Sequence, residues 1–230
     1  MKTVLITGAN RGIGLEFTKQ YLEKGRRVFA CARNLEQAEQ LQQLKTAAQD
    51  QLTLVQLDVT DAQSRTQLSK TLGDQQLHLL INNAGYYGQS NRLGQLDEED
   101  WERIFRINVM APIKLVEILR SNLAEAGAAS VAILSSKMGS MKDNTSGGSY
   151  LYRSSKAALN AAGKSLALDL AEENTKVVLL HPGWVKTDMG GPNALIDTTT
   201  SVQGMRKVIE GLTMEQTGNF FAYDGTVVPW

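Results

Sequence analysis

The amino-acid sequence predicts an α/β fold: a doubly wound parallel sheet of about seven strands, flanked by helices on both faces. Short runs of β-branched residues and leucine alternate with longer segments of helical periodicity, which is the pattern of parallel β-α-β units. Several short runs are continuously apolar, as expected of strands that helices cover on both sides. The chain has 230 residues, 42% of them hydrophobic, so we expect one domain over residues 1–230.

The elements follow one another without a linker or an internal repeat. We expect strands at residues 3–7, 27–32, 52–57, 77–82, 130–135, 176–181 and 219–222. We expect helices at residues 12–24, 35–48, 62–72, 98–125, 152–171 and 201–212. The glutamine-rich segment between Gln37 and Gln76 keeps leucines at helical spacing, which indicates solvated helix rather than disorder.

Charge and composition exclude several classes of function. Lys plus Arg is 24 and Asp plus Glu is 24, so we expect no surface for nucleic acid or for an anionic membrane. No apolar run reaches the roughly 18 residues of a membrane-spanning helix. The amino terminus lacks the layout of a signal peptide, so we expect a cytoplasmic protein. One cysteine, Cys31, and two isolated histidines, His78 and His181, predict neither a disulfide nor a metal site.

A glycine-containing turn lies between the first strand and the first helix, with the sequence Thr-Gly-Ala-Asn-Arg-Gly-Ile-Gly at residues 7–14. Gly8 allows a tight turn, Gly12 lets the backbone approach a pyrophosphate, and Gly14 permits close packing of the helix. The amino terminus of the helix offers N–H groups to phosphates. The glycine spacing differs from the common Gly-x-Gly-x2-Gly, and three glycines can simply punctuate a loop. We interpret the segment as the dinucleotide-binding turn of a Rossmann-like fold.

The end of the second strand indicates which dinucleotide binds. Many dinucleotide-binding folds place an acidic residue there for the ribose hydroxyls, whereas this chain has Arg33 and Asn34. Arg33, together with Arg11 in the glycine turn, could bind a ribose phosphate, which predicts NADP(H) over NAD. The alternative is that both arginines are ordinary surface charges.

The most specific chemical pattern combines a serine pair with a tyrosine and a lysine. Ser135 and Ser136 end the fifth strand, and Tyr152 and Lys156 share one face of the next helix. At about 4 Å and an effective dielectric near 20, their attraction is about 4 kcal/mol, or roughly three pKa units, so Tyr152 should titrate near neutrality. Such a phenol can exchange a proton with a carbonyl or alcohol oxygen while a nicotinamide moves the hydride. The same spacing also occurs by chance on helices.

The order of these motifs resembles that of the short-chain dehydrogenases/reductases over essentially the whole chain. The matching motifs are Thr7-Gly-x3-Gly-x-Gly14, Asp58-Val59, Asn82-Asn83-Ala84-Gly85, Asn108, Ser135-Ser136, Tyr152-x3-Lys156 and Pro182-Gly183-x3-Thr187. Segments 136–140 and 143–148 and the ending Tyr223-Asp224-Gly225 further resemble the C-factor and sniffer-type carbonyl reductase branch. The resemblance implies NADPH-dependent reduction of an aldehyde or ketone to an alcohol.

The resemblance also implies a role for each matching residue. Ser136 would bind the carbonyl oxygen, and Tyr152 would donate the proton. Lys156 would lower the pKa of the Tyr152 phenol and bind the nicotinamide ribose. Asn108 would support a proton relay. The implied cofactor site comprises Gly8, Asn10, Arg11, Gly12, Ile13, Gly14, Arg33, Asn34, Asp58, Val59, Asn82, Ala84, Gly85, Tyr152, Lys156, Pro182, Gly183, Val185 and Thr187. The cofactor half would span about residues 1–126, and the catalytic and substrate half about residues 127–230.

The substrate pocket and the assembly are less constrained by the sequence. We expect an apolar pocket, although each of its candidate residues could equally be ordinary packing: Tyr87, Met138, Met141, Tyr150 and Trp184. Small residues over 157–163 would allow close helix approach in a homodimer or homotetramer. An alternative function for the same fold is a nucleotide-binding signalling or sensor protein in which turnover is incidental.

Overall fold

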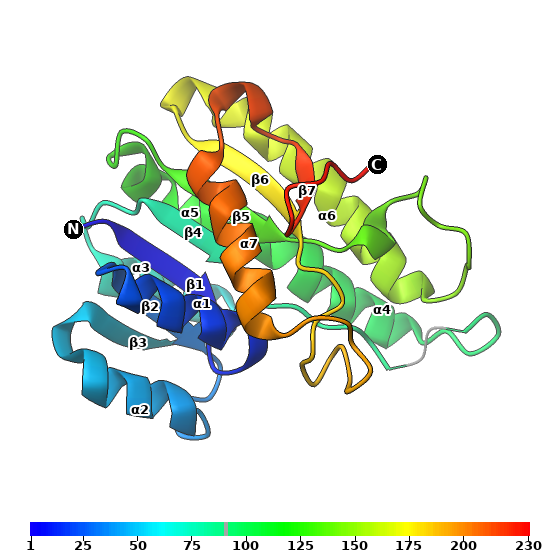
Figure 1. The fold of residues 1–230 in the computed structure, drawn as a ribbon, viewed down its shortest axis with the longest axis horizontal. Helices are drawn as coiled ribbons and strands as arrows, with labels where there is room; N and C mark the ends of the chain where they lie inside the picture. The colour runs from blue at the N-terminus through cyan, green and yellow to red at the C-terminus, as the bar shows by residue number, and fades with distance from the viewer. Residues whose placement is uncertain (90–91) are drawn as a thin grey trace.

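Seven parallel strands form one sheet in the computed structural model, which describes residues 1–89 and 92–230 (Figure 1). The order of strands across the sheet is β3-β2-β1-β4-β5-β6-β7. Their bounds are β1 Thr3–Thr7, β2 Arg27–Ala32, β3 Leu52–Gln56, β4 Leu79–Asn82, β5 Ser130–Leu134, β6 Lys176–His181 and β7 Phe220–Ala222. The chain proceeds outward from β1 to β3 and then returns to the other side of β1 as β4. This reversal places a crevice at the carboxyl ends of β1 and β4, and it confirms the predicted doubly wound fold.

Helices cover both faces of the sheet, as the apolar strands predict (Figure 1). One face is covered by α1 Gly12–Glu23, α2 Glu39–Ala48 and α7 Thr198–Gly211. The other face is covered by α3 Ala62–Leu72, α5 Ala111–Ala124 and α6 Tyr150–Asp169, and α4 Glu98–Phe105 precedes α5. No helix in the described part of the chain is long and apolar enough to cross a membrane.

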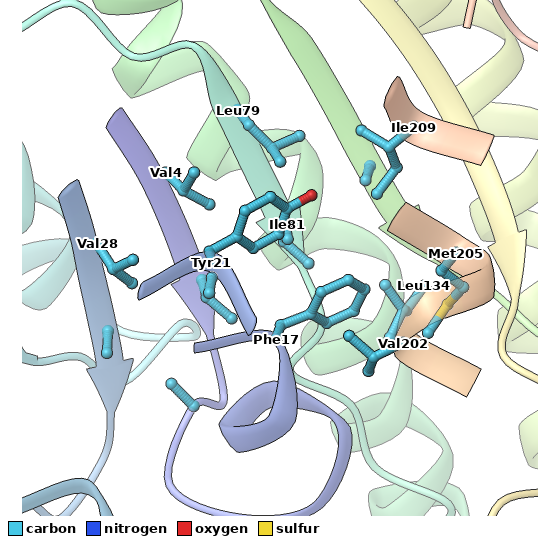
Figure 2. Packing of buried hydrophobic residues seen from close by; sticks show 14 of the residues in the cluster. Val4, Phe17, Tyr21, Val28, Leu79, Ile81, Leu134, Val202, Met205 and Ile209 are labelled. Carbon is cyan, nitrogen blue, oxygen red and sulfur yellow. The ribbon is translucent and has the colours of Figure 1, made fainter. Parts of the chain in front are cut away.

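The two cores arise because consecutive residues of a strand point to opposite faces. Val4 and Ile6 of β1 pack with Phe17 of α1 and Met205 of α7, whereas Leu5 packs on the opposite face (Figure 2). Burial of a side chain such as Phe17 contributes roughly 1.5–3 kcal/mol. Helix α1 is therefore held against the sheet and beside α7, which fixes its amino terminus at the carboxyl ends of the strands.

The expected continuous helix over residues 98–125 is interrupted, so that expectation was wrong in one respect. Helix α4 ends at Phe105, the segment Arg106–Met110 is π-helical, and α5 begins at Ala111. Pro112, in the first turn of α5, lacks the N–H that would bond the carbonyl of Asn108 in an α-helix. Short π-helical segments of this kind often occur at functional sites, and this one contains Asn108.

Three helices also begin at residues other than those expected from the sequence. Helix α7 begins at Thr198, three residues early, because the carboxylate of Asp197 accepts a hydrogen bond from Thr200 N at 2.7 Å and caps the helix. Helix α6 begins two residues early, at Tyr150. Helix α2 begins only at Glu39, because Asn34 Oδ1 accepts hydrogen bonds from two backbone N–H groups and holds residues 34–37 in a turn.

Candidate active site

A cleft of about 1200 Å³ lies at the carboxyl ends of the strands, where the strand order reverses. The glycine turn forms one wall, and the segments after β2, β3, β4 and β6 form others. Helix α6 contributes Tyr152 and Lys156, so the cleft joins the glycine turn to the tyrosine–lysine pair. A cleft of this size exceeds the roughly 300–1,000 Å³ of typical small-ligand sites, as a dinucleotide with a second ligand would require.

The glycine turn is shaped for close approach of a phosphate. Gly8 and Gly12 have φ of +64° and +53°, in the left-handed region that disfavours other residues. A Cβ on Gly14 would lie 2.2 Å from the carbonyl oxygen of Gly8, so no side chain fits there. Among the described residues, no side chain caps the amino terminus of α1, where Arg11 occupies the cap position. The first N–H groups of α1 are therefore available to an anionic ligand.

Asn83 connects the end of β4 to the glycine turn. Its Nδ2 donates hydrogen bonds to the carbonyl oxygens of Thr7 at 2.8 Å and Gly8 at 3.0 Å. The backbone N–H groups of Asn83 and Ala84 both donate to Thr7 Oγ1 at 3.0 Å. The turn therefore keeps its shape without a ligand, which lowers the entropic cost of binding one.

The sequence analysis placed Asn82 along the cofactor, and the structure does not bring it to the cleft. Asn82 is only 3% exposed, pairs with Ile133 of β5 and lies outside the cleft lining, whereas Asn83 lies in it. Among the described residues, neither amide atom of Asn82 has a hydrogen-bond partner. The period of two along a strand is the signal that separates these neighbouring asparagines, because it puts their side chains on opposite faces.

Most of the predicted cofactor residues line the cleft. They are Gly8, Asn10, Arg11, Gly12, Ile13, Arg33, Asp58, Val59, Ala84, Gly85, Tyr152, Lys156, Pro182 and Thr187. Four others lie outside the cleft lining. Gly14 packs on Gly8, Asn34 holds the turn before α2, and Gly183 and Val185 contact Ile196 in the loop after β6. The sequence analysis missed Thr60, Asn83, Tyr86, Arg103, Arg106, Ile107, Lys186, Asp188 and Met189, which also line the cleft.

Charged side chains of both signs lie in the part of the cleft formed by the segments after β2 and β3. They include Arg33 and Asp58. Partial burial acts to raise the pKa of the Asp58 carboxyl, but hydrogen bonds from Thr60 and the charges of Arg33 and Arg103 lower it on balance. Thr60 donates through its N–H at 2.8 Å and its hydroxyl at 2.7 Å. Asp58 is therefore ionised at neutral pH, and Arg33 remains in the lining beside it.

Arg11 was expected to bind a ribose phosphate, and in this structure it forms an ion pair across the cleft. Its Nη1 lies 2.9 Å from Oδ2 of Asp188, in the loop after β6, and both side chains are exposed. An exposed pair of this kind contributes at most about 1 kcal/mol, so a phosphate could displace Asp188.

Tyr152 and Lys156 line the cleft, whereas Ser136 lies just outside the lining, next to Tyr152. The hydroxyl of Ser136 is hydrogen-bonded to the phenol of Tyr152. Lys156 Nζ lies 5.6 Å from the centroid of the Tyr152 ring and donates a hydrogen bond to the carbonyl oxygen of Leu134 at 2.7 Å. A Cβ on Gly139 would lie 2.7 Å from the backbone of Lys156, so this glycine lets the turn after Ser136 pack directly on α6.

The expectation that Lys156 brings Tyr152 to titrate near neutrality was wrong for the protein by itself. Burial raises the pKa of Tyr152 to about 12, although the hydrogen bond from Ser136 acts to lower it. Burial also lowers the pKa of Lys156 to about 8. Removal from water therefore dominates the pKa of both groups, and the phenol stays protonated at neutral pH.

Asn108 positions the segment after β4. Its Oδ1 accepts a hydrogen bond from Tyr86 N, and its Nδ2 donates to Tyr86 O, both at 2.8 Å. Nδ2 also donates to Ser155 Oγ of α6 at 3.1 Å. The buried side chain therefore connects the π-helical segment, the Tyr86 backbone and α6. The role of Asn108 in a proton relay stays a prediction.

The predicted pocket residues separate into two groups. Tyr87 lines the cleft beside Tyr152, and Met138 packs in a small apolar cluster with Ile104, Leu151 and Tyr152. Met141, Tyr150 and Trp184 are exposed and lie outside the cleft lining. Met141 is 76% exposed, and the indole N–H of Trp184 donates to Gly190 O at 2.7 Å.

Comparison with known proteins agrees with this fold and arrangement. The family model for short chain dehydrogenase matches residues 2–195, and the chain belongs to this family of oxidoreductases. The chain is 49% identical to the C-signal of Myxococcus xanthus over 66% of this chain and 92% of that protein. The structure of the carbonyl reductase Sniffer of D. melanogaster matches with a TM-score of 0.94 and 36% identity, over 100% of both chains.

A second solved structure is that of an NADPH-bound carbonyl reductase from chicken fatty liver. It matches with a TM-score of 0.92 and 33% identity, and the match covers 100% of this chain and 99% of that one. These similarities confirm the expected branch of the family, the C-factor and sniffer-type carbonyl reductases.

Proposed function

We propose that the protein is an NADPH-dependent reductase that converts an aldehyde or ketone to an alcohol. The observation that carries the proposal is a cleft that joins an uncapped, glycine-lined helix terminus to Tyr152 and Lys156, with Ser136 hydrogen-bonded to Tyr152. The similarity to an NADPH-bound carbonyl reductase supports NADP(H) as the cofactor.

The residues present fit a phosphorylated dinucleotide. Gly8 and Gly12 line the cleft with backbone, Gly14 packs closely on Gly8, and no side chain of the described residues caps the first N–H groups of α1. Asp58 and Val59 would border the adenine, and Arg33 would bind the ribose phosphate. Pro182 and Thr187 would orient the nicotinamide end. When bound, NADPH supplies the hydride for the carbonyl carbon.

The chain itself would handle the carbonyl oxygen and the proton. The hydroxyls of Ser136 and Tyr152 would bind the oxygen together, which fixes the carbonyl and stabilises the negative charge that develops on it. The proton on Tyr152 Oη then passes to that oxygen, leaving a phenolate that the Lys156 ammonium stabilises. Because burial keeps the phenol in its protonated form at neutral pH, Tyr152 carries the proton that the reduction requires.

The substrate would be a small carbonyl compound rather than a macromolecule. The catalytic end of the cleft is lined by Tyr87, Tyr152, Pro182 and Met189, which favours an apolar body beside the carbonyl group. The segment from Asp188 to the start of α7 is short, so an open pocket with broad carbonyl scope is expected.

Titration with NADPH and NADH by fluorescence, with the Arg33→Ala variant alongside, tests the cofactor assignment. We expect NADPH to bind more tightly than NADH, and Arg33→Ala to weaken NADPH binding while leaving NADH nearly unchanged. Arg120→Ala, which removes an exposed charge outside the cleft lining, is the control. Equal affinity for the two nucleotides in the unaltered protein would refute the role of Arg33.

Similarity to the C-signal supports a second candidate, a nucleotide-binding signalling protein in which turnover is incidental. The variant Tyr152→Phe separates the two, because it removes the proton donor but leaves the glycine turn intact. If the variant still binds NADPH but no longer produces the protein's effect in the cell, the enzymatic function is supported. An unchanged effect supports the sensor.

We also propose that the protein acts in the cytoplasm as a homodimer. Ala157, Ala158 and Ala161 leave part of α6 with small side chains at or near the surface, where a second copy could approach closely. Gly163 serves another purpose, because it packs against Leu179 of β6 within the chain. Light scattering at low protein concentration tests the assembly, and a monomer mass would refute it.

A further inference from the structure

Tyr87 lies directly against the ring of Tyr152. The two ring centroids are 4.7 Å apart and the ring planes are inclined by 39°, a separation typical of aromatic side chains in contact. Tyr87 comes from the segment after β4, and Tyr152 comes from α6. Tyr87 is 36% exposed and both tyrosines line the cleft, so the contact between the rings removes part of the Tyr152 ring from the solvent of the cleft.

Tyr87 is fixed at both of its ends. At the backbone end, the side chain of Asn108 bonds both the N–H and the carbonyl of the preceding residue, Tyr86, at 2.8 Å. At the ring end, the Tyr87 hydroxyl and Ser149 Oγ are 3.1 Å apart and share a hydrogen bond. Ser149 directly precedes α6, three residues before Tyr152, so the bond connects Tyr87 to the helix that carries the phenol.

The backbone at Ser149 is held in a conformation that serine disfavours. Gly147, Gly148 and Ser149 have φ of +63°, +64° and +47°, so three consecutive residues are left-handed. Arg153 holds the same turn, because its guanidinium donates to Ser146 Oγ at 3.0 Å and to Met138 O at 3.3 Å. Such a conformation persists only where its surroundings determine it, and it often occurs at functional sites.

We propose that Tyr87 is a positioning residue for Tyr152: its ring, anchored by Ser149, holds the phenol in place and shields it from water. The proposal rests on the proposed function of Tyr152 as proton donor. Shielding keeps the phenol protonated until a carbonyl oxygen replaces water beside it.

The groups around Tyr152 determine whether removal of Tyr87 raises or lowers the pKa of Tyr152. Lys156 on the same helix and Tyr87 on the β4 segment are titratable groups beside Tyr152, and Ser136 contributes a hydroxyl. The side chains packed on it from α4 and from the turn after β5 include Ile104 and Met138, which are apolar. Burial raises the pKa of Tyr152 and the charge of ionised Tyr87 raises it further, so removal of Tyr87 lowers it on both counts.

Ultraviolet titration of tyrosine ionisation in the protein without cofactor tests the proposal. Each protein is compared with its Tyr152→Phe counterpart, and in Tyr87→Ala and Tyr87→Phe, which lack the Tyr87 phenol, the difference reports Tyr152 alone. We expect Tyr87→Ala to lower the pKa of Tyr152 by about one unit, and Tyr87→Phe, which keeps the ring, to lower it less. An unchanged Tyr152 titration in Tyr87→Ala would overturn the proposal. If circular dichroism shows that Tyr87→Ala does not fold, Tyr87→Leu takes its place under the same criterion.

Two variants at Ser149 separate the effect of its hydroxyl, which bonds Tyr87, from the effect of its left-handed backbone conformation. Ser149→Ala and Ser149→Gly both remove the hydroxyl, but only glycine suits the left-handed conformation. We expect the two to lower the pKa of Tyr152 equally, although the glycine variant is the more stable. A Tyr152 titration that changes only in the alanine variant would show that Ser149 acts through the backbone and would overturn the anchoring role.

Kinetic measurements extend the test to the reaction. With NADPH and an aromatic aldehyde as the probe, Tyr87→Ala should move the alkaline limb of kcat/KM to lower pH and reduce kcat more than it changes KM. A protein without reductase activity would refute the proposed function, while the tyrosine titration would still decide the role of Tyr87. If the alkaline limb of kcat/KM lies at the same pH in the unaltered protein and in Tyr87→Ala, the positioning role of Tyr87 is refuted.

Discussion

The glycine turn between β1 and α1 and the cluster at the start of α6 form two ends of one cleft, but they use different parts of the chain. The turn works through backbone atoms and through the absence of side chains at Gly8, Gly12 and Gly14. The cluster works through the side chains of Tyr152 and Lys156, both removed from water. A site made of backbone depends on local conformation, whereas buried ionisable groups depend on everything packed around them.

This contrast determines how each region responds to substitution. In the turn, added atoms collide with neighbouring backbone, and the fold and binding weaken together. In the cluster, removal of a functional group abolishes chemistry and can stabilise the fold, because a buried charge costs free energy. The following substitutions test that difference, beginning with the largest expected effect.

Tyr152→Phe should produce the largest loss. Removal of the phenol hydroxyl eliminates the proton donor, and loss of general acid catalysis lowers kcat by roughly 10²–10⁴-fold. Steady-state reduction of a carbonyl by NADPH measures the change, and fluorescence titration should show that NADPH still binds. A variant that retains most of its turnover would place the proton donor elsewhere.

Lys156→Met should abolish activity and stabilise the fold. Burial lowers the pKa of Lys156 from 10.5 to about 8, so the folded protein loses up to about 3 kcal/mol by holding the charge. This cost is fully present below pH 8, where both states are protonated, and it shrinks as the pH rises toward 10.5. Urea unfolding of both proteins at pH 7 and pH 10 measures the difference.

The gain from Lys156→Met should therefore be largest at neutral pH and nearly absent at pH 10.5. A destabilised variant at pH 7 would show that the hydrogen bond from Lys156 to Leu134 outweighs the cost of burial. In that case the cluster would resemble an ordinary packed core, and the contrast with the glycine turn would fail.

Gly14→Ala should destabilise the protein by about 1–3 kcal/mol and weaken NADPH binding, because its Cβ would meet Gly8 O at 2.2 Å. Gly211→Ala is the matched control, since it also replaces a helical glycine and its Cβ would meet nothing within 4 Å. The control should be neutral or slightly stabilising. Thermal unfolding and fluorescence titration give both quantities, and equal behaviour of the two variants would refute the tight packing at Gly14.

Asp188→Ala should have the smallest effect. It removes the exposed ion pair with Arg11, so stability should change by less than about 1 kcal/mol. With Arg11 released toward the ligand, NADPH should bind slightly more tightly at low salt, and the gain should disappear at about 1 M salt, where charges are screened. Weaker NADPH binding in this variant would show that the ion pair helps to hold the cofactor instead.

Local sequence patterns were sufficient for the framework. The strands at Thr3–Thr7, Arg27–Ala32 and Lys176–His181 have the expected bounds, because apolar runs between turn residues define them. The meeting of Tyr152 and Lys156 follows from helical spacing alone. The distinction between Asn82 and Asn83 was available in the strand period but was missed, since both asparagines belong to one motif.

Other properties depended on contacts between distant segments. The break at Arg106–Met110 involves the hydrogen bonds of Asn108 to Tyr86, and the ion pair of Arg11 requires the loop after β6. Burial raises the pKa of Tyr152 in the protein by itself, which the sequence did not reveal, because helical spacing gives the distance to Lys156 but not the amount of water excluded.

The sequence by itself therefore determined the order of strands and helices, the glycine turn and the residues that meet at the start of α6. These features depend on backbone preference and on periodicity, which act over a few neighbouring residues. The tertiary structure decided which side chains face the cleft, how Tyr87 covers Tyr152 and in which direction the buried groups titrate. Those outcomes depend on burial, and burial is the combined effect of segments that meet only in the folded chain.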